Sequence, residues 1–328
     1  MISVTSGINE KMKFIEHLWY GKHPLRFLLA PLSWLFCAIV LLRRLAYKYN
    51  LFQSYQAPVP VIIVGNITVG GTGKTPLVSW LGQFLKKQGF KPGIISRGYG
   101  GQAQEWPQEV HKDSDPRFVG DEPVLLARQS GCPVVVAPKR AMAVQSLLKN
   151  QNCNIIISDD GLQHYGLQRD IEIVVLDGTR RFGNKYCLPA GPLREHISRL
   201  NSVDFIVTTG ETMQYKLKPL RGVCNNKLSQ DLVELRGQTV HAVAGIGNPT
   251  RFFSILRDYG LKLHCHEWLD HHDYCPADIQ FNDELPVIMT EKDAVKCQDF
   301  ANSQHWYLPI EAQLPKSYGE DLLQLLKK

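Results

Sequence analysis

The fold of this chain is decided by three consecutive segments: VPVIIVGN (residues 59–66), TVGGTGKT (68–75) and PLVSWLGQFLKKQG (76–89). The first is a short apolar run rich in β-branched residues, which is typical of a buried strand in a parallel sheet. The last is amphipathic and ends at a glycine, which predicts a helix. A strand, a glycine-rich turn with Gly-Lys-Thr, and a helix in this order indicate a phosphate-binding loop.

The chemistry of the predicted loop follows from its residue types. Its glycines let backbone N–H groups converge on phosphate oxygens, and the helix that follows adds the positive end of its dipole. The Lys74 ammonium can reach the β- and γ-phosphates, and the Thr75 hydroxyl can bind Mg²⁺. The strict pattern has glycine at the position of Thr68, so we expect Gly70 and Gly71 to supply the flexibility; a chance glycine-rich turn is the alternative. The candidate nucleotide-binding residues are Thr68, Val69, Gly70, Gly71, Thr72, Gly73, Lys74 and Thr75.

Alternation of strands and helices continues beyond the loop and predicts an α/β fold of the P-loop NTPase-like, doubly wound parallel type. From about residue 223 a second, smaller α/β unit is indicated by strands in 239–249 and 285–296 and a helix at 250–260. We therefore expect an N-terminal membrane-associated helical segment (1–52), a nucleotide-binding domain (53–222) and a C-terminal α/β domain (223–328). Further strands of the first domain are predicted at 91–100, 132–138, 153–161, 171–178 and 203–210, with helices that include 141–150.

Polar residues follow several predicted strands. Asp159 and Asp160 end the strand at 153–161, where an acidic residue faces the ligand crevice of an open α/β sheet and commonly holds a metal ion. A loop cap is the alternative for this acidic pair. Asp121 opens a helix in Gly-Asp-Glu-Pro, and helix capping is its alternative role. Other chemistry-capable residues near strand ends are Arg97, Tyr99, Glu122, Gln163, His164, Arg194 and Glu195.

The composition limits the class of protein. With 328 residues, 44% hydrophobic and 21% charged, the chain is neither disordered nor collagen-like nor a multi-span membrane protein. Residues 1–50 hold seven Lys or Arg and two acids, so they carry +5 of the net charge of +6. The rest of the chain is nearly neutral. A basic N-terminal segment of this kind, here called the head, favours a partner that binds this segment over nucleic acid. The eight cysteines form no C-x-x-C pair, and we expect them to be mostly reduced thiols.

The basic head contains the run FLLAPLSWLFCAIVLL (27–42), which has no charged residue. As a helix it would be about 24 Å long, which is short for a bilayer core of about 30 Å. Pro31 should kink or start this helix. Arg43, Arg44 and Lys48 then alternate with apolar and aromatic residues, which suits a lipid headgroup layer. The pattern predicts a membrane-docked or shallowly inserted helix, with a buried core helix as the alternative.

Histidines and cysteines crowd into residues 264–275 and raise the question of a zinc site. The segment LKLHCHEW alternates as a strand would, so His264 and His266 should share one face and Cys265 the other. The sequence DHHD is better interpreted as a loop that projects His271 toward a cleft between the domains. We therefore expect no zinc here.

Eight motifs in order resemble the tetraacyldisaccharide 4'-kinase family, the lipid A 4'-kinases of Gram-negative bacteria. The resemblance extends from the apolar head to about residue 297, and the loop of this family also lacks the glycine that Thr68 replaces. The motifs are GNITVGGTGKTP, SRGYGG, VGDEP, SDDGLQH, PAGPLRE, AGIGNPTRF, DHH and TEKDAVK.

The resemblance implies a membrane-associated enzyme on the cytoplasmic face of the bacterial inner membrane, held there peripherally or monotopically by its N-terminal helix. The enzyme would transfer the γ-phosphoryl group of ATP, with Mg²⁺, to the 4'-hydroxyl of a tetraacyldisaccharide 1-phosphate. The product would be the 4'-phosphorylated lipid A precursor, lipid IVA, of lipopolysaccharide biosynthesis. Its partners would be the acylated glucosamine disaccharide and the membrane surface, without nucleic acid.

The resemblance also implies roles for individual residues. Asp121 would be the general base, His271 its partner and Lys74 the phosphate-loop lysine, although His272 is adjacent and stays open as that partner. Thr75 and Glu122 would lie at the metal, as would Asp159 and Asp160, between which the sequence does not choose. Further motif positions, with less defined roles, are Arg97, Tyr99, Arg140, Gln163, His164 and Glu195.

Two other classes of protein compete with this interpretation. A membrane-tethered GTPase or ATPase switch, or a transport ATPase, would share the phosphate loop, but TEKD (290–293) is only a weak echo of an N-K-x-D guanine-binding motif. The second competing class is a membrane-tethered binding module whose nucleotide site has decayed. The intact Gly-Lys-Thr sequence and the Asp-Asp pair argue against it.

Overall fold

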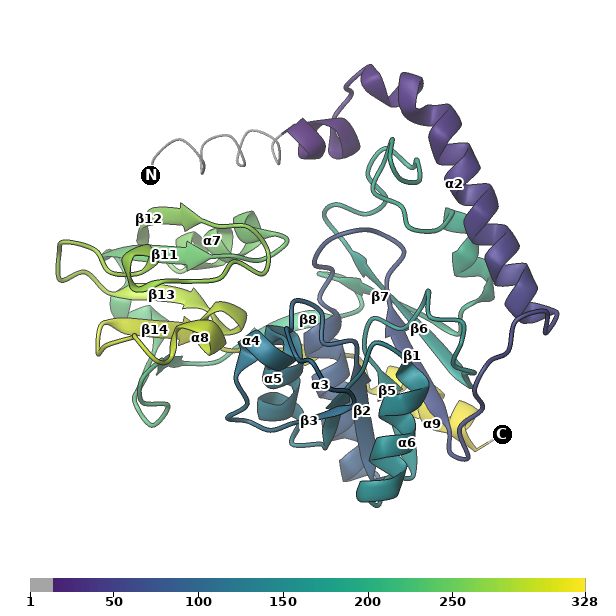
Figure 1. The fold of residues 1–328 in the computed structure, drawn as a ribbon. Coiled ribbons are helices and arrows are strands. Elements are labelled where there is room, and N and C mark those ends of the chain that lie inside the picture. The colour runs from purple at the N-terminus through teal and green to yellow at the C-terminus, as the bar shows by residue number, and fades with distance from the viewer. Residues whose placement is uncertain (1–13, 328) are drawn as a thin grey trace.

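The computed structural model describes residues 14–327, and two β-sheets organise them (Figure 1). The larger sheet has seven strands in the order β3-β4-β2-β5-β1-β6-β7, all parallel except β3, which runs antiparallel to β4. The predicted doubly wound parallel α/β fold is confirmed. The strands are β1 (Val61–Gly65), β2 (Pro92–Ser96), β3 (Gln108–Val110), β4 (Val134–Val136), β5 (Ile155–Ser158), β6 (Ile171–Asp177) and β7 (Phe205–Thr209).

Helices cover both faces of this sheet, because its central strands are apolar on both sides. Along β1, Ile62 and Val64 join one core, while Val61 and Ile63 join the other. The first core is completed by α3 (Lys74–Lys87), α5 (Asp121–Ser130) and α9 (Lys316–Leu326), and the second by α6 (Arg140–Asn150) and part of α2. A short helix, α4 (Pro116–Val119), leads into α5, and a 3-10 helix, η1 (Ile197–Ser202), precedes β7.

The second sheet has six strands in the order β10-β9-β14-β13-β11-β12, with parallel central strands and antiparallel β9 and β10. The strands are β9 (Leu220–Gly222), β10 (Ser229–Gln230), β11 (Thr239–Ala244), β12 (Lys262–Glu267), β13 (Val287–Thr290) and β14 (His305–Leu308). The accompanying helices are α7 (Pro249–Asp258), α8 (Glu291–Cys297), η2 (Leu232–Leu235) and η3 (Pro276–Asp278).

A two-stranded ribbon of β8 (Gln214–Leu217) and β15 (Ile310–Gln313) joins the two sheets. After β15 the chain returns to the larger sheet, where Tyr318 of α9 packs against Trp80. The division into residues 1–52, 53–222 and 223–328 stays a prediction. Two segments cross it, because β9 precedes residue 223 but lies in the second sheet, and α9 follows it but packs on the first.

The head forms a helix at residues 14–20 and then α2 (Leu25–Lys48), while Glu10, Lys11 and Lys13 lie outside the described residues. Pro31 lies inside α2, so the prediction that it starts the helix is wrong; Pro24 is the N-cap. The 24 residues of α2 span about 36 Å. The helix as a whole is thus long and apolar enough to cross a membrane, by length and composition alone, although its uncharged run is shorter.

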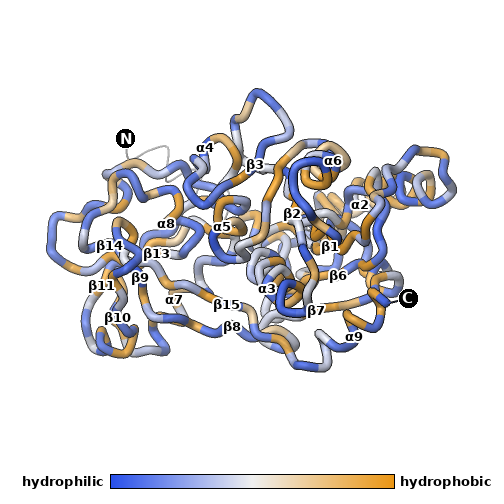
Figure 2. The backbone as a smooth tube through the Cα atoms, turned by 90° about the horizontal axis from the view of Figure 1, so that it is seen from below, coloured by the Kyte–Doolittle hydropathy of each residue, from blue (hydrophilic) through white to orange (hydrophobic). Residues whose placement is uncertain are grey.

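Only a narrow face of α2 packs on the body of the protein. Ser33 is buried; its hydroxyl donates to the Cys187 carbonyl at 2.8 Å and accepts from the Ala190 N–H at 3.0 Å. Near the other end, Arg44 donates to the Ser202 hydroxyl at 2.7 Å. Only Ala30 and Ser33 of α2 are buried, so the alternative of a buried core helix is wrong. Figure 2 shows α2 on the side of the larger sheet that is away from the second sheet. The exposed apolar side chains of α2 include Phe27, Leu28, Leu32, Trp34, Leu35, Ile39, Leu41 and Leu42.

The cysteines differ in part from the prediction of reduced thiols. Cys37 of α2 and Cys187 of the body, 150 residues apart, form a disulfide that no local sequence pattern predicts. The other six cysteines, all within residues 14–327, are free: Cys132, Cys153, Cys224, Cys265, Cys275 and Cys297.

The return of α9 to the first core can be tested by Leu322→Ala. Leu322 is fully buried, so its truncation should lower the free energy of unfolding by about 2–5 kcal/mol. Gln324→Ala, on the exposed side of the same helix, should change it by less than about 0.5 kcal/mol. Urea unfolding of both variants is the measurement, and equal midpoints would contradict the packing of α9.

Candidate active site

The phosphate loop connects β1 to α3 and reaches its shape through glycine. Gly73, the N-cap of α3, has a φ of 91°, and a Cβ there would collide with the Tyr215 hydroxyl. Gly70 is also left-handed, with a φ of 103°. Thr68, which replaces the expected glycine, is buried and forms a β-bridge with Leu193, so a side chain fits at that position.

The acidic pair lies beside this loop, because β5 is the neighbour of β1 in the sheet. The Lys74 ammonium is 3.4 Å from Asp160 Oδ1, and Arg194 is 3.2 Å from the same carboxylate. Burial alone would raise the pKa of Asp160, but these two cations outweigh it and lower the pKa to about 2. Asp160 also has a left-handed backbone, with a φ of 45°, which is uncommon outside glycine.

Asp159 is in the opposite electrostatic situation. Its side chain is buried; Oδ2 accepts a hydrogen bond from Ser96 at 3.3 Å, and Oδ1 has no partner among the described residues. Burial and the nearby Glu122 carboxylate raise the pKa of Asp159. An unsatisfied, buried carboxylate oxygen of this kind is what a cation would satisfy.

The donors near the loop fit Mg²⁺, since Thr75, Glu122, Asp159 and Asp160 offer only oxygen. Within residues 14–327, no three His, Cys, Asp or Glu side chains are already gathered around a metal position. Mg²⁺ does not require such a cage, because it usually binds one or two carboxylates together with phosphate and water.

The histidine-rich strand behaves as its alternation predicts. His264 and His266 of β12 both lie against His241, while Cys265 contacts Arg257 of α7 on the opposite side. The two histidines therefore lie on one face of the strand and the cysteine on the other.

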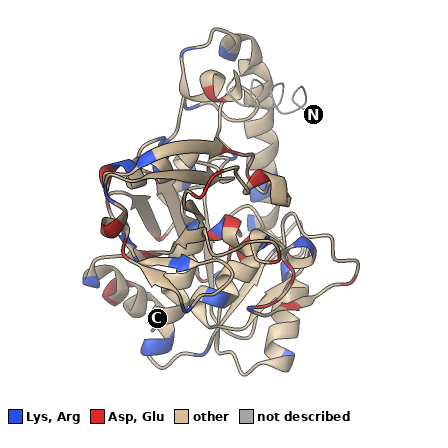
Figure 3. Cartoon of the chain, turned by 90° about the vertical axis from the view of Figure 1, so that its left-hand side faces the viewer, with Lys and Arg blue, Asp and Glu red and all other residues tan. Residues whose placement is uncertain are grey.

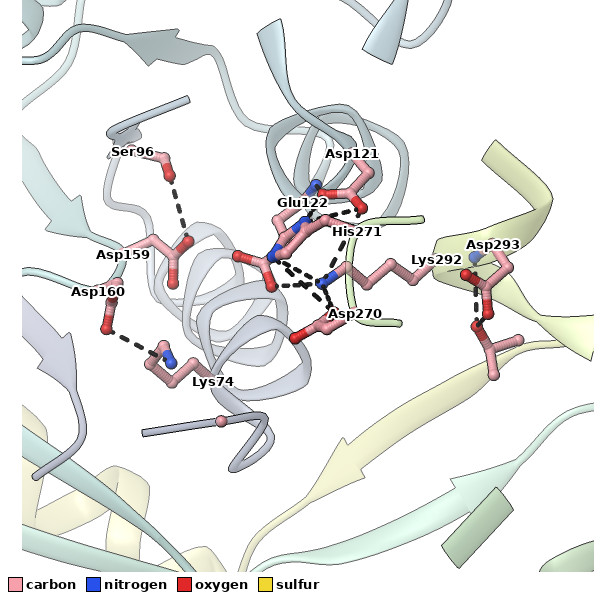
Figure 4. A network of polar contacts seen from close by, with 12 residues as sticks. Lys74, Ser96, Asp121, Glu122, Asp159, Asp160, Asp270, His271, Lys292 and Asp293 are labelled. Carbon is pink, nitrogen blue, oxygen red and sulfur yellow. Dashed lines mark hydrogen bonds and ion pairs between the residues drawn. The ribbon is translucent and has the colours of Figure 1, made fainter. Parts of the chain in front are cut away.

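Asp121 meets His271 across 150 residues of sequence. The Nδ1 of His271 lies 3.0 Å and 3.1 Å from the two carboxylate oxygens of Asp121 (Figure 4). His272 instead contacts Asp278 at 3.0 Å and stacks on Trp268. His271, like Asp160, has a left-handed backbone, with a φ of 61°. Strained residues of this kind cluster at functional sites.

Asp121 is the first residue of α5 and not its cap, since the N-cap is Gly120. Burial by itself raises the pKa of Asp121, but the hydrogen bond from His271 and the charges of Lys292 and Lys296 outweigh it and hold the pKa below its usual value. For His271, burial lowers the pKa and the hydrogen bond to Asp121 more than restores it, so that the pKa is raised. Asp121 is thus an ionised acceptor near neutral pH.

Sequence reasoning missed two residues at this contact. The Lys292 ammonium lies 2.9 Å from Glu122 and 2.9 Å from Asp270 (Figure 4). Both residues stand in the quoted motifs, Asp270 beside His271 and Lys292 in TEKDAVK. A lysine in the first turn of a helix, against the helix dipole, was the available signal.

The remaining predicted residues surround the acidic pair and the base. Arg140 is buried and donates to the Asp159 carbonyl at 2.7 Å. Gln163 joins the Asn66 carbonyl at 3.0 Å to the Glu195 carboxylate at 2.8 Å.

His164 lies among arginines, and Tyr99 lies beside His271. Burial and four nearby arginines lower the pKa of His164 to about 4. These arginines are Arg140, Arg169, Arg43 of α2, and the exposed Arg97. The C-terminal end of α2 therefore lies near His164. Tyr99 is placed differently, with its ring 5.1 Å from that of His271.

Two cavities lie close to the base, lined by adjacent residues of the same segments. One, of about 190 Å³, is lined by residues 71–76 of the phosphate loop and by Glu122, Asp270 and Lys292. The other, of about 620 Å³, is lined by Tyr99, Asp121, His271 and Lys296. Figure 3 shows acidic and basic residues close together near the centre of the view.

Comparison with known proteins agrees with this geometry. The sequence model of a family described as tetraacyldisaccharide-1-P 4'-kinase matches residues 25–327. A tetraacyldisaccharide 4'-kinase of Nitrosococcus oceani is 51% identical over 98% of this chain and 96% of the relative. One of Methylobacillus flagellatus is 51% identical over 96% of each.

A solved structure has the same fold. It is described as the "apo" form of LpxK from Aquifex aeolicus in complex with ATP. Its TM-score is 0.78 at 26% identity, over 92% of this chain and 99% of that one. The phosphate loop, the paired acids and the full-length similarity lead to one conclusion: this chain belongs to the tetraacyldisaccharide 4'-kinase family.

Proposed function

We propose that this chain transfers the γ-phosphoryl group of ATP to the 4'-hydroxyl of a tetraacyldisaccharide 1-phosphate, which yields the 4'-phosphorylated lipid A precursor. The family supports this reaction. The observation that carries it is the position of Lys74 in the phosphate loop, 3.4 Å from Asp160 after β5, with the ionised Asp121 lining the neighbouring cavity.

The phosphate side of the reaction depends on positioning and charge. Phosphoryl transfer passes through a loose transition state, so little covalent chemistry is required of the protein. Lys74 stands at the start of α3, where its ammonium and the backbone N–H groups of the loop face the same cavity. We infer that Lys74 neutralises charge on the phosphoryl oxygens, while Arg194 and Arg140 keep the acidic pair in place.

The acceptor side requires a base. The 4'-hydroxyl oxygen forms a bond to the γ-phosphorus, the bond from that phosphorus to the ADP oxygen breaks, and the hydroxyl proton must leave. Asp121 is buried and ionised, and His271 donates to it, so Asp121 has the geometry to orient the hydroxyl and accept its proton. Tyr99 and the residues near α2, which include Arg97 and His164, would face the saccharide.

Thr75, Glu122, Asp159 and Asp160 are the residues that would hold Mg²⁺. The unpaired Oδ1 of Asp159 and the all-oxygen donor set support this assignment. When bound, the metal would supply charge neutralisation at the phosphoryl oxygens. Glu122 is also held by Lys292, so its carboxylate is oriented before any metal binds.

The acceptor is a lipid, and α2 offers a surface for it. We propose that the exposed apolar face of α2 docks in the cytoplasmic leaflet of the inner membrane. Contacts with the body in the first half of α2, at Ser33, and near its C-terminal end, at Arg44, favour a helix that lies on the membrane over one that crosses it. Arg43 and Lys48 are placed for contact with anionic headgroups.

The proposed reaction is tested by incubation of the protein with ATP, Mg²⁺ and the acylated disaccharide 1-phosphate. Tandem mass spectrometry should show one added phosphoryl group on the distal sugar. A switch or a transport ATPase would hydrolyse ATP and leave the glycolipid unchanged, and that outcome would refute the proposal.

Asp121→Ala should lower kcat by about 10²–10⁴-fold, because it removes the proton acceptor and leaves the phosphate loop intact. The KM for ATP should stay within about threefold of wild type, since Asp121 does not line the phosphate-loop cavity. Asp113→Asn, an exposed acid of the same 620 Å³ cavity, is the control and should retain full kcat. Normal turnover by Asp121→Ala would remove Asp121 from the chemistry.

The docking face is tested by replacing Leu28, Leu35 and Leu42 together with serine. Each leucine contributes roughly 1.5 kcal/mol or more when buried, so binding to anionic vesicles should weaken at least about 100-fold. The double variant Leu228→Ser/Val233→Ser removes exposed apolar side chains elsewhere and should bind as wild type. Vesicle sedimentation measures both, and unchanged binding of the triple variant would exclude this face.

A further inference from the structure

Lys292 lines the 190 Å³ cavity and contacts His271, which lines the 620 Å³ cavity. Its ammonium lies 2.9 Å from Glu122 Oε1, 2.9 Å from Asp270 Oδ1 and 3.5 Å from His271 Nε2 (Figure 4). Two carboxylates accept hydrogen bonds from the ammonium, and a ring nitrogen of His271 lies beside it. The lysine therefore contacts three residues of the proposed catalytic centre.

The second sheet fixes the position of this lysine. Lys292 is the second residue of α8, which starts directly after β13. The Asp293 carboxylate accepts from the Thr290 hydroxyl at 2.6 Å and from the Gly245 N–H at the end of β11 at 2.9 Å. The first turn of α8 is thus tied to two central strands, and the lysine extends from a rigid base.

Local chemistry disfavours a lysine at this position. A cation in the first turn opposes the helix dipole, and a buried ammonium is costly unless it is paired. Burial alone would lower the pKa of Lys292, but the carboxylates of Glu122, Asp121 and Asp270 outweigh it and raise the pKa, so the charge persists. A residue that is unfavourable for its helix position but is paired with opposite charges is typical of a functional site.

The contact with His271 has a consequence for the base. Nδ1 of His271 faces Asp121 at 3.0 Å, while Nε2 faces Lys292 at 3.5 Å and Asp270 Oδ1 at 3.8 Å, so Lys292 and Asp270 hold the ring in the orientation that points Nδ1 to Asp121. Glu122 and Asp270 hold the ammonium from the phosphate-loop side, while His271 lies on the other side. Lys296 does not replace it, since its ammonium lies over the Tyr274 ring and 3.6 Å from Asp121.

We infer that Lys292 is a positioning residue for the proposed phosphoryl transfer, on which this inference rests: it holds Glu122, Asp270 and His271 in one arrangement so that His271 presents its Nδ1–H to Asp121. The lysine acts through these residues and makes no contact with Asp121 closer than 4.0 Å. It also keeps three neighbouring carboxylates from repelling one another where a polyanionic nucleotide must enter.

Lys292→Met, which keeps the length of the side chain and removes its charge, tests the inference in the full-length protein. We expect kcat to fall about 10- to 100-fold, as for other residues that orient a catalytic group, with the KM for ATP within about threefold of wild type. Lys292→Arg should recover part of kcat, because it restores the charge. Lys262→Met, at an exposed lysine of the second sheet, is the control and should match wild type.

A double variant separates positioning from simple charge balance. Lys292→Met/Asp270→Asn removes the ammonium together with one carboxylate, so it folds without an added buried charge, and its kcat should stay as low as that of Lys292→Met. The inference is overturned if the double variant recovers wild-type kcat, if Lys292→Met keeps kcat within threefold, or if only KM changes. Failure of the wild-type protein to phosphorylate the glycolipid would instead refute the proposed reaction.

Discussion

The hydrogen bond between His271 and Asp121 constrains the whole architecture, because it joins the two halves of the molecule. Asp121 starts α5, which packs on the first sheet, and His271 lies in the loop after β12 of the second. The hydrogen bond forms only if the second sheet docks on the first with opposite charges in register. Lys292 and Lys296 of α8 supply the cations, and Asp121 and Glu122 at the start of α5 supply the anions. Burial of these groups would be costly without pairing, so the charges that serve the site also specify how the sheets meet.

Backbone contact complements this charge pairing on the nucleotide side. Gly247, in the turn after β11, lies so close to Gly71 that a Cβ on Gly247 would come 2.5 Å from the Gly71 nitrogen. Arg180, from the loop after β6, donates to the Gly247 carbonyl at 2.7 Å and ties the turn to the first sheet. The phosphate loop, which follows β1 of the first sheet, is therefore covered by a glycine turn of the second, and this contact requires glycine at position 247.

Elements that depend on periodicity and local motifs can be predicted from the sequence. Features that depend on contacts between distant residues cannot. The parallel strands β1, β2, β4, β5, β6 and β7, the phosphate loop and the acidic pair follow from patterns within about ten residues, whereas β3 (Gln108–Val110) was not predicted. The short strands β9 and β10 and the return of α9 carry no such signal. Lys292 was quoted within a motif but given no role, since only the structure shows that α8 points it at Glu122 and Asp270. The same contact information separates His271 from His272, which adjacent positions in DHHD could not.

The position of α2 relates the proposed membrane surface to the phosphate loop through direct contacts. Tyr47 packs on Tyr165, whose hydroxyl donates to Glu195 at 2.6 Å. Glu195 in turn accepts from Gln163, which also donates to the Asn66 carbonyl just before the loop. These side chains are part of one packed body, so a bilayer docked on the outer face of α2 would lie at a fixed height above Lys74 and Asp160. A lipid-linked hydroxyl could then reach the γ-phosphoryl group while its acyl chains stay among other lipids, because the enzyme and not the substrate spans that distance.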